Sequence, residues 1–307
     1  MKKRPIIIDT DIGGDMDDTW ALAMALKAPE LDLKMVLTCC DDPTYRAKII
    51  AKMCEAAGRC DVEIGFGLQT PDGVRYQAGW TEDYDLSKYP GKIHKDGIGA
   101  MIDLIMNSDE EITLITIGNA HNIPEILRRE PKIANKVHVI GMFGSVYVGY
   151  PWEPGGKISA ESNVVSDVKS SKLYINAFDS IEITPLDTCR EIVIKGDNLD
   201  KIVAKRDKDP LINAVLENFE IWKDHCDFWR AHKGMFDISS DLYDTVAIYM
   251  AITHDNLEFE SLKLSVDDKG YTIIDNENGH PVDVAVRWAD KDKYIDYLTQ
   301  VFLINDC

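Results

Sequence analysis

Basic residues are scarce in this 307-residue sequence. Its 34 lysines and arginines stand against 53 aspartates and glutamates, which gives a net charge of −19. Because a protein that binds a phosphate backbone needs clustered lysine and arginine, this deficit argues against a nucleic-acid partner. It also disfavours binding to an anionic membrane surface. We therefore expect neither nucleic acid nor membrane among the partners of this protein.

The sequence also lacks long apolar runs and a disulfide framework. No run approaches the roughly 18 apolar residues that a membrane span needs, and the basic start leads into a short strand rather than a signal peptide. The seven cysteines are odd in number, form no C-x-x-C pair and include the adjacent Cys39 and Cys40. This pattern is typical of reduced thiols inside a cell, so we expect a cytoplasmic enzyme or binding protein.

Internal repeats, low-complexity segments and linkers are absent too, which favours a single domain over residues 1–307. Apolar runs alternate with helical patterns: we expect strands at residues 5–8, 33–38, 61–66, 112–117, 137–142 and 181–185, and helices at residues 17–28, 45–57, 96–106, 123–129, 211–229 and 245–252. This alternation predicts an α/β fold with an open, mostly parallel, Rossmann-like sheet flanked by helices. A small antiparallel addition closed by a helix should follow, with strands at residues 258–264, 271–274 and 282–286.

The first predicted strand ends in five aspartates within ten positions: Asp9, Asp11, Asp15, Asp17 and Asp18. Carboxylates this close repel one another unless a cation or a helix N-terminus neutralises them. An EF-hand is excluded, because the twelfth position counted from Asp9 or Asp15 is Trp20 or Leu26 instead of glutamate. In an open α/β sheet, ligands bind at the carboxyl ends of the strands. The turn therefore predicts a catalytic divalent-metal site that recruits further ligands from elsewhere in the chain.

A strand followed by D-x-D resembles the haloacid-dehalogenase phosphohydrolases. In this interpretation Asp9 is the nucleophile, Asp11 the acid and Mg²⁺ the metal, and Thr116 stands in for the second motif of that family. However, Gly13 lies where the family has threonine or valine, and the three later aspartates have no role.

A longer series of motifs resembles the calcium-dependent nucleoside hydrolases, the inosine-uridine-preferring group. The N-terminal motif of that family, D-x-D-x-G-x-D-D, is similar to a longer variant here, DTDIGGDMDD at residues 9–18. Further similar segments follow in the order of the family between residues 5 and 250: TYRAK (44–48), HKDGIG (94–99), TIGNAHN (116–122), VIGMFGS (139–145), AESN (160–163) with Asp167, and LYDTVA (242–247).

The resemblance implies Ca²⁺ as the cofactor, held by Asp11, Asp18, Asp244 and the backbone carbonyl of Ile117. A hard cation accepts about six to eight oxygens, so protein ligands, a water and two ribose hydroxyls can share it. Asp17 would take a proton from the metal-held water.

The resemblance also implies contacts to the ribose. Glu161 and Asn163 would hydrogen-bond the hydroxyls of the sugar, and Met142 would pack beneath it. Cleavage of an N-glycosidic bond passes through an oxocarbenium-like state, which carboxylates near the sugar stabilise.

The chain departs from the family at several implied contacts. Tyr243 stands where well-studied members have a histidine that assists departure of the base, and a phenol, with a reference pKa near 10, is a poorer acid at neutral pH. The sugar-binding asparagine expected after the second strand is absent, and we predict Asp42 as its substitute. Gly155 replaces a second asparagine. Trp229 or His232, shortly before the last motif, would stack on the base.

These observations predict a ribonucleoside N-ribohydrolase that converts a small-molecule ribonucleoside and water into ribose and a free base. We also expect a homodimer or homotetramer, located in the cytoplasm. Two alternatives stay open at this point: the phosphohydrolase, and a nucleoside- or ribose-binding relative that keeps the metal but catalyses weakly.

Overall fold

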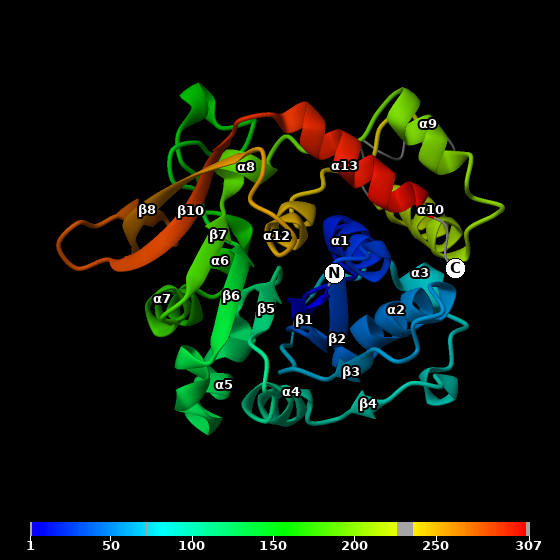
Figure 1. The fold of residues 1–307 in the computed structure, drawn as a ribbon, viewed down its shortest axis with the longest axis horizontal. Helices are drawn as coiled ribbons and strands as arrows, with labels where there is room; N and C mark the ends of the chain where they lie inside the picture. Colours follow the sequence, from blue (N-terminus) through cyan, green and yellow to red (C-terminus); the bar gives the residue numbers. More distant parts are fainter. Residues whose placement is uncertain (1, 72, 226–235, 305–307) are drawn as a thin grey trace.

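A ten-stranded sheet runs through the protein in the computed structural model, which describes residues 2–71, 73–225 and 236–304 (Figure 1). The strands are β1 (Arg4–Thr10), β2 (Leu31–Thr38), β3 (Glu63–Gly65), β4 (Ile93–His94), β5 (Ile112–Thr116), β6 (Val137–Met142), β7 (Ile181–Thr184), β8 (Leu257–Val266), β9 (Thr272–Ile274) and β10 (His280–Trp288). Their order across the sheet is β4-β3-β2-β1-β5-β6-β7-β10-β8-β9.

The pairing of the strands is parallel from β4 to β7, and β10 also pairs in parallel with β7. β8 pairs antiparallel with both β10 and β9, so the C-terminal strands form an antiparallel extension of the same sheet. In Figure 1, β8 and β10 project to the left of the view, whereas the helices α9 (Asp197–Val203) and α10 (Pro210–Lys223) lie on the right. The predicted fold class, a mostly parallel α/β sheet with a small antiparallel addition, is confirmed.

Helices cover both faces of the sheet. They are α1 (Asp17–Lys27), α2 (Pro43–Ala56), α3 (Ala78–Thr81), α4 (Gly97–Met106), α5 (Ile123–Arg129), α6 (Ser162–Ser166), α7 (Val168–Ala177), α8 (Leu186–Cys189), α9 (Asp197–Val203), α10 (Pro210–Lys223), α12 (Thr245–Met250) and α13 (Lys291–Leu303). Among the residues described, every helix is too short or too polar to cross a lipid bilayer.

The core of the protein lies in two layers, one on each face of the sheet. Ile6 and Ile8 of β1 pack into the layer beneath α1, α2, α10, α12 and α13, whereas Ile7 between them packs into the layer with α4, α5 and α7. All three side chains are fully buried. A strand that is covered on both faces reads as a continuous apolar run, which explains why the sequence around residue 7 shows no polar alternation.

Helix α10 is shorter than predicted. Its pattern suggested a helix over residues 211–229, but α10 ends at Lys223 and residues 224–225 form a turn. The last part of the predicted helix, including Trp229, lies outside the described residues, as does His232.

Candidate active site

The aspartate-rich turn connects the end of β1 to the start of α1. Thr10, the last residue of β1, donates a hydrogen bond from its hydroxyl to the Asp18 carboxylate and accepts one from the backbone amide of Ile12 (3.1 Å). Gly13 has a φ of +111°, and a Cβ at this position would lie 2.7 Å from the ring of Tyr45. Position 13 therefore needs glycine. The turn leads directly into α1, whose first residues include Asp18.

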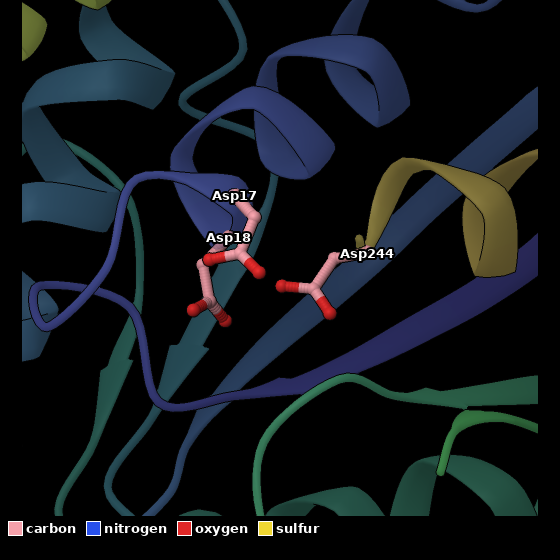
Figure 2. A group of neighbouring side chains, drawn as sticks. All are labelled: Asp17, Asp18 and Asp244. Carbon is pink, nitrogen blue, oxygen red and sulfur yellow. The ribbon is translucent and has the colours of Figure 1, made fainter. Parts of the chain in front are cut away.

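Three carboxylates from opposite parts of the chain converge beside this turn. Oxygens of Asp17, Asp18 and Asp244 all lie within 4.8 Å of one another, and Figure 2 shows the three side chains pointing toward a common space. Asp17 and Asp18 begin α1, whereas Asp244 immediately precedes α12. The Asp11 carboxyl lies near them, and its negative charge raises the pKa values of Asp17 and Asp18.

Burial makes these carboxylates costly to ionise. The pKa values of Asp17 and Asp244 are raised well above the usual range, first by loss of solvent and then by the neighbouring negative charges. The Arg46 guanidinium is 3% exposed and lowers the pKa of Asp11 and Asp18, but burial outweighs it. Its Nε and Nη1 already donate to backbone carbonyls at 3.0 and 2.6 Å. A group of carboxylate oxygens without enough protein cations fits a hard divalent cation.

The convergent carboxylates open onto a cavity of about 760 Å³. The residues that line it include most of those predicted for the site: Asp11, Asp17, Asp18, Ile117, Met142, Glu161, Asn163, Tyr243 and Asp244. They come from the ends of β1, β5 and β6 and from the starts of α1, α6 and α12. The cavity therefore lies at the carboxyl edge of the parallel strands, where the sequence predicted a ligand.

One side of the cavity is organised by Asn163 and Glu161. The Asn163 side-chain amide donates to the backbone carbonyls of Ile117 and Met142, each at 3.2 Å. The Glu161 carboxylate caps α6 and accepts from the amide of Asn163 at 2.8 Å and from that of Gly144 at 3.0 Å. Burial nevertheless raises the pKa of Glu161 to about 7. These contacts fix both side chains against the ends of β5 and β6.

The comparison with known proteins agrees with this geometry. The family described as inosine-uridine preferring nucleoside hydrolase matches residues 6–296. The chain belongs to this family. The non-specific ribonucleoside hydrolase RihC of Salmonella paratyphi B is 24% identical to it over 314 residues, which cover 97% of each chain.

Solved structures of nucleoside hydrolases share the fold. An inosine-uridine preferring nucleoside hydrolase from Bacillus anthracis has a TM-score of 0.75 at 18% identity, over 98% of this chain and 99% of that one. A purine-preferring ribonucleoside hydrolase from Gardnerella vaginalis has a TM-score of 0.76 at 17% identity, over 97% and 98%.

Membership confirms the predicted enzyme class, a glycosidase that acts on N-glycosyl bonds. Nucleoside hydrolases convert ribonucleosides into ribose and a free base and depend on a metal.

The competing phosphohydrolase interpretation is wrong for this nucleoside hydrolase. Asp9, the nucleophile it requires, is 2% exposed and is not among the residues that line the cavity. The side chain of Asn122 donates to both oxygens of Asp9 at 3.1 Å, and burial raises the pKa of Asp9 to about 8. The Thr116 hydroxyl is buried too and shares a hydrogen bond of 2.8 Å with Tyr174.

Asp42 lies away from the cavity of the nucleoside hydrolase. Its carboxylate caps α2 by accepting from the amide of Thr44 at 2.9 Å, and the residue lines a separate small pocket. The cavity instead contains Cys40 and Asn119, whose side chains meet at 3.4 Å (Nδ2 to Sγ). The structure therefore places Asp42 outside the cavity, and its predicted contact to the sugar stays a prediction.

The nucleoside hydrolase also has cavity residues that the motifs did not indicate. Arg46, Tyr150 and Trp152 line the cavity, together with His121, which contacts Asp167 at 3.1 Å. Of these, Arg46 and His121 lie inside motifs quoted above, although the motifs gave neither residue a role. The burial of Arg46 was the signal that the sequence did not provide. Tyr150 and Trp152 belong to the long segment at residues 143–160, which has no periodic pattern.

Proposed function

We propose that this nucleoside hydrolase binds Ca²⁺ through Asp11, Asp18, Asp244 and the backbone carbonyl of Ile117, and hydrolyses the N-glycosidic bond of ribonucleosides. The observation that supports it is the convergence of Asp17, Asp18 and Asp244 within 4.8 Å in a buried place. When bound, Ca²⁺ would make a water more acidic and orient two ribose hydroxyls.

The side chains of the protein supply the remaining steps. Asp17 is half-buried at the start of α1 and lines the cavity, so its carboxylate takes the proton of the attacking water. Because both hydrogens of the Asn163 amide nitrogen face backbone carbonyls, its Oδ1 is the atom left to accept a ribose hydroxyl. Glu161 adds a second acceptor, and Met142 packs beneath the sugar.

Tyr243 contacts the leaving-group side in this proposal. Its ring is half-buried, lines the cavity and lies edge-on to Tyr150 at 6.4 Å between centroids. Burial raises the pKa of its hydroxyl, so the phenol stays protonated and is a weak acid. Trp229 and His232 remain predicted contacts to the base.

We further propose a cytoplasmic homodimer or homotetramer without nucleic-acid or membrane partners. The net charge of −19 supports the absence of nucleic-acid and membrane partners, and the cysteine pattern supports a location in the cytoplasm. Sedimentation velocity of the purified protein tests the assembly, because a lone monomer at micromolar concentration would contradict it.

The activity test uses inosine, uridine, cytidine, adenosine and p-nitrophenyl riboside, with either CaCl₂ or a chelator present. We expect ribose release, measured as reducing sugar, only with the metal present. Release of phosphate from a phosphomonoester without ribose from any nucleoside would contradict the proposal. Ligand-dependent thermal stabilisation without ribose from any of the five substrates would identify a binding relative instead.

A further inference from the structure

An aromatic wall faces the cavity on the side of Tyr243. The rings of Tyr150 and Trp152 are stacked, with centroids 4.6 Å apart and planes inclined by 6°. Tyr243 lies edge-on to Tyr150 and completes the wall. Trp152 is 68% exposed although it lines the cavity, so a large π-face remains accessible to a flat ligand. An indole face attracts aromatic rings, and it attracts cationic rings more strongly.

Carboxylates surround this aromatic wall in excess over cations. Among the described residues, the cavity is lined by seven carboxylates, one arginine and one histidine. Three of the carboxylates are accounted for by the proposed Ca²⁺ site. Asp15 has none of the proposed roles. It is exposed on the turn before α1, and within the described part of the chain its carboxylate accepts one hydrogen bond, from the amide of Met16 at 2.8 Å. It lines the same cavity as Trp152, where carboxylates outnumber cationic side chains.

Tyr243 is the side chain placed on the leaving-group side of the cavity, where its half-buried ring lies edge-on to Tyr150. A phenol has a reference pKa near 10, so it is a poor proton donor at neutral pH and gives little help to a departing neutral base. A neutral base needs a proton when its bond to the ribose breaks, whereas a base that carries a fixed positive charge does not.

A ribonucleoside with a positively charged base can be hydrolysed without an acid that protonates the base. The bond between C1′ and the base nitrogen breaks, and its electron pair stays on that nitrogen, so the positively charged base leaves as a neutral molecule. The oxygen of water forms a new bond to C1′, and its proton goes to the Asp17 carboxylate. No oxidant, reductant or second proton donor is required.

We infer that the preferred substrates are ribonucleosides whose base carries a permanent positive charge, such as an N-ribosylpyridinium or an N7-alkylated purine nucleoside. The inference rests on the proposed ribonucleoside hydrolase function and narrows its substrate class. The stacked Trp152 and Tyr150 bind the charged ring through its face, and the carboxylate of Asp15 complements its charge. The weakly acidic phenol of Tyr243 disfavours neutral bases, which need a proton when they leave.

The test compares guanosine with N7-methylguanosine, which differ by one methyl group and one positive charge. Ribose release is measured in mildly acidic buffer with CaCl₂, and each kcat is divided by the uncatalysed rate of the same compound. We expect a KM about tenfold lower for N7-methylguanosine, together with the higher corrected kcat/KM.

Two variants separate charge from stacking. Asp15→Asn should raise the KM for N7-methylguanosine about fivefold and leave the KM for guanosine within about twofold. Trp152→Leu should raise the KM for N7-methylguanosine about tenfold and that for guanosine less. The matched controls are Asp103→Asn on α4 and Tyr147→Leu, whose side chains are exposed and lie outside the cavity, and these should change neither KM.

The outcomes distinguish this inference from the function on which it rests. Equal corrected kcat/KM values for guanosine and N7-methylguanosine would overturn the charged-base preference and leave the hydrolase function in place. Faster corrected turnover of neutral inosine or uridine would do the same. Absence of ribose from every nucleoside would instead contradict the proposed function.

Discussion

Two edges of the same sheet handle buried carboxylates in opposite ways. At the amino edge, Glu182 on β7 contacts His254 at 2.8 Å and His138 on β6 at 3.4 Å, and these partners lower the pKa of Glu182 to about 2 against the effect of its burial. At the carboxyl edge, Asp17 and Asp244 lie beside other carboxylates, and their pKa values are raised.

Under the proposed function, the carboxylate at the amino edge stabilises the fold, whereas those at the carboxyl edge bind an external cation. The amino edge supplies its own imidazoles, so the Glu182 cluster needs no ligand. At the carboxyl edge the only guanidinium among the described cavity residues, that of Arg46, is held by backbone carbonyls. We expect the carboxylates of the proposed Ca²⁺ site to lower the stability of the metal-free fold. Such a destabilising group can persist in a protein when the function depends on it.

The largest expected effect comes from Asp17→Asn. Loss of the proposed general base should lower kcat on inosine or on a cationic nucleoside by roughly 10²–10⁴-fold, because a positioned base contributes about that factor. Calcium binding, measured by isothermal titration calorimetry, should persist, since Asp17 is not one of the proposed ligands. An unchanged kcat would show that another group accepts the proton.

Asp244→Asn should separate function from stability at the carboxyl edge. Calcium affinity should fall at least about 100-fold, because the variant lacks one charged ligand. The metal-free protein should become more stable by about 1–2 kcal/mol, because a buried like-charge repulsion is removed. Thermal unfolding in a chelator measures this, and a destabilised metal-free variant would mean that Asp244 is paired within the fold.

Glu182→Gln tests the amino edge with the same kind of substitution. Here we expect a loss of about 1 kcal/mol in the free energy of unfolding, because charged contacts to His254 and His138 disappear. The loss should be equal with and without Ca²⁺, and kcat should not change. Stabilisation by Glu182→Gln would remove the distinction between the two edges.

The carboxylates at the two edges should also change the free energy of unfolding with pH in opposite directions. Glu161 and Asp9 have folded pKa values raised to about 7 and about 8, so they bind protons more tightly in the folded state. Their contribution is present below the unfolded values near 4 and is lost as the pH rises through about 7–8. Glu182, lowered to about 2, contributes above its unfolded value and is lost as the pH falls toward 2.

Chemical denaturation of the metal-free protein across pH measures this smallest effect. We expect the highest stability near pH 5 and a decline toward pH 9, where Ca²⁺ should restore it. A metal-free protein that becomes more stable from pH 5 to pH 9 would contradict the raised pKa values at the carboxyl edge.

Features that lie within one stretch of sequence could be predicted from that stretch. The run of buried isoleucines predicts β1, and the aspartates behind it predict a cation site, because their repulsion follows from spacing alone. Asp244 lies far along the chain and could be placed only through the family resemblance. The two-residue strand β4 and the four-residue helix α3 are too short for a periodic signal.

The position of Asp42 outside the cavity has a physical cause in the backbone. Cys40 and Asp41 both have positive φ values, 50° and 49°, in the left-handed region that side chains other than asparagine and aspartate seldom adopt. These two residues turn the chain after β2, so that Cys40 lies in the cavity and Asp42 caps α2. Residue types alone did not indicate such a turn. Tyr150 and Trp152 were missed for a similar reason, because a loop has no repeating pattern.

The most direct test of the central claim is calorimetric titration of Ca²⁺ into chelator-treated protein. If the unpaired carboxylates form the cation site, wild type and Glu182→Gln will bind one Ca²⁺ per chain, and Asp18→Asn will bind none over the same concentration range. Binding that Asp18→Asn leaves unchanged, or no binding by the wild type, would contradict the account.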